Sequence, residues 1–104
     1  LPLLKRSEIV WRKTVGGAQI VMGEFMAGAA GGDLLVAGKT YDGRSDILLV
    51  RLDSRGSILW RKTYGNEADE RPAGVVAKDG NFIIAGTRGP RGYGDVYLLK
   101  VDEK

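Results

Sequence analysis

Short apolar runs separated by glycine and aspartate recur along most of the chain. The most compact are "LLVAG" at 34–38 and "FIIAG" at 82–86, and longer ones follow as "ILLVRLD" at 47–53 and "VYLLKVD" at 96–102. The stretch "SILWRKTY" at 57–64 alternates apolar and polar residues before a glycine. Runs of this length, rich in β-branched and aromatic residues, predict strands. We therefore expect an all-β protein.

The residues between these runs are typical of turns. Gly31-Gly32 and Asp79-Gly80 fit two-residue hairpin turns, which need a positive φ. The tetrapeptide "DSRG" at 53–56 fits a turn with glycine at its last position. The pattern thus predicts antiparallel strands joined by short connections.

One stretch has helix-forming residues but is still predicted to be a strand. "EFMAGAAGG" at 24–32 contains three glycines in nine residues, which disfavour a helix. It aligns with "PAGVVAKDG" at 72–80, whose paired valines favour a strand. The expected strands lie around residues 8–14, 25–30, 33–38, 46–53, 57–63, 73–78, 81–87 and 95–102.

The chain contains an internal repeat of 49 residues. The tetrapeptide "WRKT" occurs at 11–14 and again at 60–63. Further identities keep the same spacing: Ile9 with Ile58, Gly16 with Gly65, Asp46 with Asp95, Leu49 with Leu98, and Asp53 with Asp102. The spacing slips to 48 where 31–40 aligns with 79–88, so that one residue is lost and regained at expected loops. A repeat of this length with four strands is typical of a β-propeller blade.

These motifs resemble the quinoprotein-like β-propeller repeats, in the variety that reads W-x-K-T-Y-G-G, then D-G-G-x-x-x-A-G-x-T, then D-x-x-L-x-K-x-D-x-x-G-x-x-x-W. The stretches that carry the resemblance are "WRKTVGG" and "WRKTYGN", "GGDLLVAGKT" and "DGNFIIAGTR", and "DILLVRLDSRGSILW" and "DVYLLKVDEK". The resemblance implies one two-blade unit over residues 1–104, with repeat 1 at about 11–59 and repeat 2 at about 60–104. Each blade would be a four-stranded antiparallel sheet, and the strand around 8–14 would be displaced to complete a blade.

Two blades are too few to close a propeller, which usually has about four to eight. One solution is a homo-oligomer that assembles head to tail by strand exchange, a trimer of six blades or alternatively a tetramer of eight. The other is that the chain is part of a longer propeller. The sequence leaves both open.

Composition excludes several kinds of chemistry. There is no cysteine and no histidine, so disulfides, thiol nucleophiles and imidazole bases or ligands are absent. The 16 basic and 13 acidic residues are scattered, and we expect neither nucleic acid nor a membrane as a partner. We identify no signal peptide and no membrane-spanning segment, and the cellular location stays open. No catalytic residue, metal or cofactor is expected.

The resemblance implies that two kinds of connection meet on one face of the molecule. These are the connections from one blade to the next and the connections between the second and third strands of each blade. Loops on a rigid scaffold often carry binding residues. The candidate ligand- or partner-binding residues are Tyr41, Asp42, Arg44, Glu67, Asp69, Arg71, Arg88, Arg91 and Tyr93, with Glu70 beside them. Trp11 and Trp60 are expected to be structural and to pack between blades. We expect a non-catalytic interaction module that binds a macromolecule, a protein or a glycan; the alternatives are a lectin-like glycan-binding ring and a fragment of a larger propeller enzyme.

Overall fold

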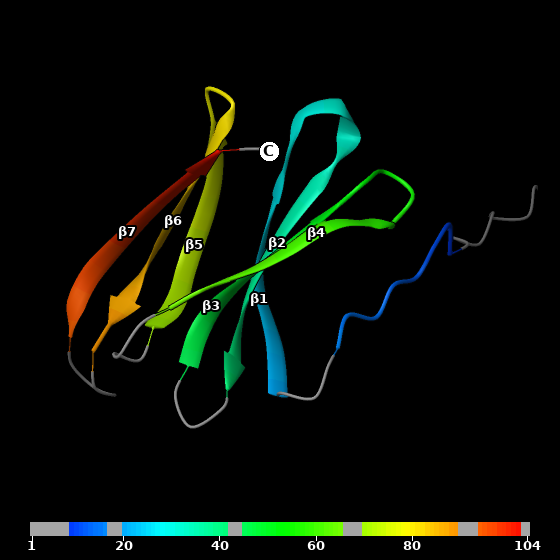
Figure 1. Ribbon diagram of the computed structural model, residues 1–104. Helices are drawn as coiled ribbons and strands as arrows, with labels where there is room; N and C mark the ends of the chain where they lie inside the picture. Colours follow the sequence, from blue (N-terminus) through cyan, green and yellow to red (C-terminus); the bar gives the residue numbers. More distant parts are fainter. Residues whose placement is uncertain (1–8, 17–19, 42–44, 66–69, 90–93, 103–104) are drawn as a thin grey trace, which may run out of the picture.

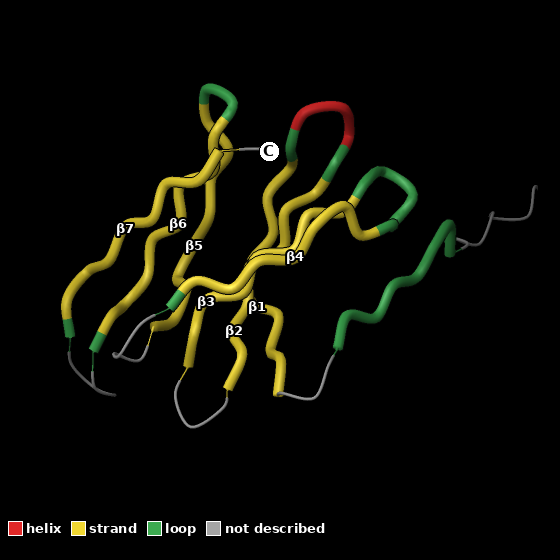
Figure 2. The backbone as a smooth tube through the Cα atoms, viewed as in Figure 1, coloured by secondary structure: helices red, strands yellow, loops and turns green. Residues whose placement is uncertain are grey.

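The computed structural model describes residues 9–16, 20–41, 45–65, 70–89 and 94–102. Seven strands form two antiparallel sheets, and the secondary structure within the described residues otherwise consists of one short 3-10 turn, Ala30–Gly32 (Figures 1 and 2). The strands are β1 (Ile20–Gly28), β2 (Leu34–Tyr41), β3 (Ser45–Leu52), β4 (Ile58–Tyr64), β5 (Glu70–Lys78), β6 (Asn81–Arg88) and β7 (Asp95–Asp102). The all-β prediction is confirmed.

Each sheet is a meander, in which strands adjacent in sequence are adjacent in space. The first sheet has the order β1-β2-β3-β4 and the second has β5-β6-β7. The apolar runs of the sequence form β2, β3, β6 and β7, where β-branched and leucine side chains fill the pleated surface. Seven of the eight predicted strands are present, although β1 and β5 begin earlier than expected, at Ile20 and Glu70, and β1 ends at Gly28.

The two sheets repeat each other in hydrogen-bonding register. Ala37 lies opposite Leu49 in the first sheet, and their counterparts Ala85 and Leu98 lie opposite each other in the second. A β-bulge interrupts the first strand pair of each sheet, between Gly23 and Phe25 and between Pro72 and Gly74. The repeat in the sequence is therefore also a repeat in the backbone.

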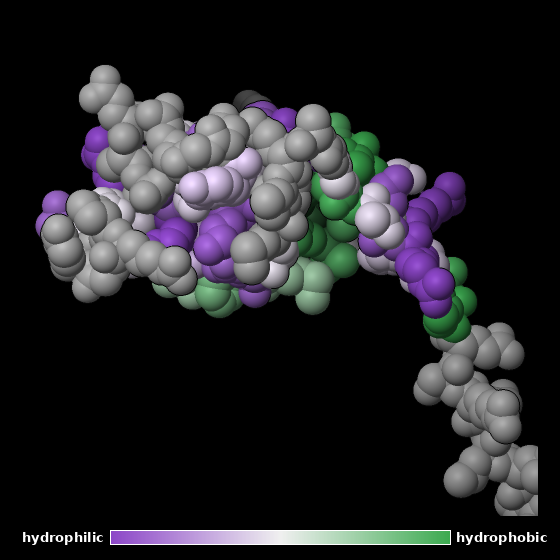
Figure 3. Space-filling model, turned by 90° about the horizontal axis from the view of Figure 1, so that it is seen from below, coloured by the Kyte–Doolittle hydropathy of each residue, from purple (hydrophilic) through white to green (hydrophobic). Residues whose placement is uncertain are grey.

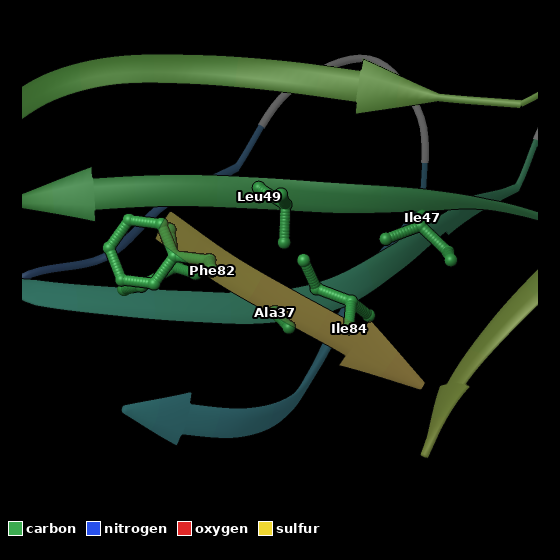
Figure 4. Close-up of a cluster of buried hydrophobic side chains, with 6 residues drawn as sticks. Ala37, Ile47, Leu49, Phe82 and Ile84 are labelled. Carbon is green, nitrogen blue, oxygen red and sulfur yellow. The ribbon is translucent and has the colours of Figure 1, made fainter. Parts of the chain in front are cut away.

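The core lies between the two sheets (Figure 4). The first sheet contributes Leu35, Ala37, Ile47 and Leu49, and the second contributes Phe82 and Ile84, all of which are fully buried. We call this side of the first sheet its front face. The side of the second sheet that carries Phe82 and Ile84 is its back face.

Arg51 extends the contact between the sheets beyond the apolar core. It lies opposite Leu35 on the front face of β3, and its guanidinium lies 5.9 Å from the ring centre of Phe82. Asp33 holds it in place, with Nη2 at 3.0 Å and Nε at 3.1 Å from Asp33 Oδ2. A buried arginine is tolerated here because a carboxylate and an aromatic ring both compensate its charge.

The back face of the first sheet carries a second, smaller apolar cluster. Leu48, Val50 and Leu52 are buried there, with exposures of 5% or less. Val36 and Val15 pack against them. Val15 belongs to the N-terminal segment, residues 9–16, which therefore covers part of this face.

Two predictions about local structure need correction. The N-terminal segment, expected to be a strand around 8–14, belongs to neither sheet over its described residues. It is attached by side-chain bonds instead, from Trp11 to the Ser54 carbonyl and from Arg61 of β4 to the Gly16 carbonyl. The Asp79-Gly80 turn has two residues with positive φ as predicted, but the connection around Gly31-Gly32 runs from Ala29 to Asp33. Asp33 accepts a backbone bond from Ala29 at 2.8 Å, which closes this longer loop.

Candidate functional site: the loop end

The ends of all seven strands fall into two groups at opposite ends of the molecule. At one end lie the turns β1–β2, β3–β4 and β5–β6 (Figure 1). At the other, which we call the loop end, lie the strand termini Tyr41, Ser45, Tyr64, Glu70, Arg88 and Asp95. The connections β2–β3, β4–β5 and β6–β7 therefore leave the sheets on the same side.

A buried carboxylate lies at the loop end. Glu70 is the first residue of β5 and is 0% exposed. It lies opposite Arg88, the last residue of β6, and Oε1 is 3.8 Å from Arg88 Nε. A buried carboxylate of this kind requires a compensating positive charge, because its desolvation is costly.

Arg88 is fixed on one side and accessible on the other. Its guanidinium lies 5.9 Å from the ring centre of Tyr97, in addition to the ion pair with Glu70. Its side chain is nevertheless 44% exposed. A guanidinium held by a carboxylate and a ring, with further N–H donors facing solvent, can bind an acceptor on a partner without a large loss of side-chain entropy.

Near Glu70 and Arg88, glycines allow close contacts that a Cβ would block. A Cβ at Gly86 would overlap the carbonyl oxygen of Arg71, so only glycine allows β5 and β6 to approach at their bulge. In the first sheet, a Cβ at Gly65 would overlap the carboxylate of Asp46. These glycines fix the backbone at the base of the connections.

Tyr41 ends β2 and is 52% exposed. Seen from the loop end, hydrophilic residues gather near the middle of the molecule, and hydrophobic residues gather on the side next to the N-terminal segment (Figure 3). Exposed tyrosine and arginine are residue types that proteins often use for contacts with partners. Tyr41 and Arg88 are the residues of this kind in the described part of the loop end.

The structure places three of the nine predicted binding residues. Tyr41, Arg71 and Arg88 lie at strand ends on the loop end, and Arg88 is joined to Glu70. The other six, which are Asp42, Arg44, Glu67, Asp69, Arg91 and Tyr93, lie outside the described residues.

Glu70, which the sequence groups with the loop charges, is buried in the structure. A signal was present in the repeat, because the residue 49 positions earlier is the apolar Val21. Sequence reasoning also missed Tyr97, which was counted only as a strand residue and whose ring lies beside Arg88.

The two tryptophans have different surroundings. Trp60, on β4, packs against the core between the sheets, and Lys62 Nζ lies 4.7 Å from its ring centre. Trp11, in the N-terminal segment, is 38% exposed and donates its indole N–H to the Ser54 carbonyl at 3.0 Å. Neither lies among the strand ends of the loop end.

The turn beneath Trp11 is closed by hydrogen bonds between its own residues. Asp53 Oδ1 accepts the backbone N–H groups of Arg55 at 2.8 Å and Ser57 at 2.9 Å, and these bonds hold the pKa of Asp53 below its ordinary value. Gly56 has φ +86°, and a Cβ there would lie 2.7 Å from the Trp11 ring. This turn positions the N-terminal segment and is remote from the loop end.

The described residues contain no cluster of three or more acidic side chains that could hold a metal ion. Over the same residues, no helix has the length and apolar character needed to cross a membrane.

Comparison with known proteins gives no match: no protein-family model matches the chain, and no curated protein and no solved structure is significantly similar to it.

Proposed function

We propose that the chain is a non-catalytic scaffold of two β-propeller blades that binds a protein partner through its loop end. The observation that carries the proposal is the repetition of strand order, register and bulge position in two sheets that stack face to face. Radial repetition of small antiparallel sheets is the principle on which propellers are built.

The direction of stacking supports the blade interpretation. The front face of the first sheet meets the back face of the second, as shown by the shared cluster of Leu49 with Ile84. In a sandwich whose two sheets met through equivalent faces, front would face front or back would face back. Front-to-back contact is what a row of identical blades requires, because each blade then offers the same surface to the next.

The gathered connections support a binding role. Three connections leave the sheets at the loop end, and a semi-exposed Arg88 is held there by Glu70 and Tyr97. A surface with a preorganised arginine and the exposed Tyr41 favours a protein partner with acceptor groups.

The proposal is tested by panning a displayed library of random peptides against the purified chain and measuring the affinity of the selected peptides. Tyr41→Ala at the loop end should weaken binding at least about tenfold, the equivalent of about 1.4 kcal/mol. The matched control is Arg55→Ala, at an exposed turn of the opposite end, and it should leave the affinity unchanged.

Selected peptides that bind the Tyr41→Ala variant as well as the wild type would contradict the proposed surface. A parallel screen on a glycan array separates the two partner classes. Saturable glycan binding in the absence of peptide binding would replace the protein partner by a glycan.

A further inference from the structure

The outward face of the second sheet is apolar and exposed. Val96, Leu98 and Val76 are 83%, 67% and 56% exposed. They lie on the side opposite Phe82 and Ile84, because Val76 is paired with Ile83 and Leu98 with Ala85. We call this side the front face of the second sheet.

The counterparts of these residues in the first sheet are buried. Ile47 and Leu49 occupy the same repeat positions as Val96 and Leu98, and both are 0% exposed. What covers them is the back face of the second sheet. The same surface is therefore covered in one sheet and open in the other.

The chain also carries the complementary surface at its other side. The back face of the second sheet uses Ile84 and Leu99, which pair with each other. The same positions in the first sheet are Val36 and Val50, which also pair. One end of the stack thus exposes the front half of the interface, and the back half lies at the other end, where Val15 of the N-terminal segment packs on the buried Val50.

The N-terminal segment lies on the back of the first sheet as β4 lies on the back of the second. Tyr64 of β4 packs into the core between the sheets, and its burial and the charge of Asp102 on β7 raise its pKa. Val15, 49 positions earlier, packs on Leu48, Val50 and Leu52. The segment therefore already occupies the place of the last strand of a preceding sheet.

Such a strand would pair with the outer edge of β7. Within the described residues, β7 has β6 as its hydrogen-bonded neighbour, whereas its counterpart β3 is paired on both sides, with β2 and β4. An edge of this kind pairs readily with an additional strand.

We propose that a second copy of this chain covers the front face of the second sheet. Its first sheet stacks there through its back face, and its N-terminal segment becomes the fourth strand beside β7. The register follows from β3 and β4, in which Ile47 lies opposite Tyr64 and Leu49 opposite Lys62. The corresponding intermolecular pairs are Val96 with Val15 and Leu98 with Lys13.

This assembly rests on the proposed blade architecture and adds the identity of one partner. Because the two surfaces differ, the contact is heterologous, and repeated contacts either close into a ring or continue as a filament. The trimer expected from the sequence would be a ring of six blades, which lies within the range that is common for propellers.

Cysteine cross-linking tests the register directly, since the chain has no cysteine of its own. Lys13→Cys and Leu98→Cys chains are refolded together and oxidised, and so are Thr14→Cys and Tyr97→Cys chains. In an antiparallel strand pair, the distance between opposite Cα atoms alternates between longer and shorter from one residue pair to the next. One of the two combinations therefore has the Cα separation that suits a disulfide better. The expected result is a mixed dimer of twice the 11.2 kDa chain mass in at least one combination.

The control combines Arg12→Cys with Leu98→Cys, whose side chains would lie on opposite faces of the sheet, and it should not cross-link. Failure of both combinations, or equally efficient dimerisation of Leu98→Cys alone, would overturn the proposal, the latter because it means contact between equivalent faces. Peptide binding measured on the same chains separates the two proposals. If the chains bind the selected peptides but do not cross-link, the proposed loop-end function stands and the proposed assembly is wrong.

Discussion

The two sheets have the same register but different coverage. The first sheet has four strands and is covered on both faces, so that Leu48 and Leu49, which point to opposite sides, are 3% and 0% exposed. The second has three described strands, and while its back face is in the core, Leu98 on its front face is 67% exposed. Since the sequences of the strands are similar, the difference comes from the neighbours of each sheet and not from the strands themselves.

This comparison shows which property of the repeat is local and which is not. Strand pairing depends on residues close in sequence, and its register is the same in both halves. Burial depends on what stacks on the sheet, and it differs. Equivalent substitutions in the two halves therefore separate the contribution of stacking from that of the strand.

The largest difference is expected for the leucine pair. Leu49→Ala should lower the free energy of unfolding by about 2–5 kcal/mol, because it removes a fully buried side chain from the core. Leu98→Ala should cost less than about 1 kcal/mol in dilute solution, because the side chain is largely in water already. Urea denaturation of both variants at low concentration measures this, and equal losses would contradict the comparison.

The tryptophans give the next difference. Trp60→Ala should cost about 3 kcal/mol, since the ring packs against the core between the sheets. Trp11→Ala should cost about 1 kcal/mol in the dilute chain, where the ring makes one hydrogen bond and rests on a turn. Thermal denaturation followed by circular dichroism compares them. A larger loss for Trp11→Ala would mean that the N-terminal segment is more tightly held than its contacts imply.

Substitutions at two glycines measure how much the contact of the Trp11 ring with its turn contributes to stability. Gly56→Ala introduces a Cβ against the Trp11 ring at φ +86°, whereas Gly31→Ala introduces one at φ +73° with no atom within 4 Å. Both substitutions should lower the free energy of unfolding by about 1 kcal/mol, because alanine is strained at a positive φ. Gly56→Ala should be less stable than Gly31→Ala by roughly a further 1 kcal/mol. Combining it with Trp11→Ala should remove the excess, and a persisting excess would show that the ring contact is not its cause.

The smallest effect is expected from pH at the same turn. Folding favours the charged form of Asp53, because its pKa is lowered by two backbone N–H donors. Its contribution is therefore complete well above the ordinary aspartate pKa of about 3.9 and is lost as the pH falls through the lowered pKa of the folded state. The stability advantage of the wild type over Asp53→Asn should shrink between pH 5 and pH 2 in denaturant titrations. An advantage that grows on acidification would have the wrong sign.

Much of the fold was predictable because the repeat carries its signals twice. The apolar runs fixed β2, β3, β6 and β7, and the Asp79-Gly80 dipeptide predicted the hairpin that the structure contains. The starts of β1 and β5 were not predictable from pattern. The start of β5 lies among charged and small residues, and the start of β1 is an apolar run without alternation. A bulge also interrupts each of these strands near its start.

The loop end was predictable in position and not in detail. The resemblance to propeller repeats implied that Tyr41 and Arg88 share an end, and both lie at the loop end. The buried Glu70 could not be deduced from its charge, which normally indicates solvent. Its burial results from tertiary packing at the start of β5 and from the partner Arg88 across the strand pair.

The central claim is that the open front face of the second sheet is the surface that the first sheet of another copy covers. Its most direct test is the mass of the wild-type chain in solution, measured by sedimentation at micromolar concentrations beside a Leu98→Asp variant. The account predicts a wild-type assembly of a whole number of 11.2 kDa chains, three in the expected ring, and a Leu98→Asp variant that stays folded and sediments as a single chain. A wild-type chain that sediments at 11.2 kDa throughout, with the same profile as Leu98→Asp, would contradict it.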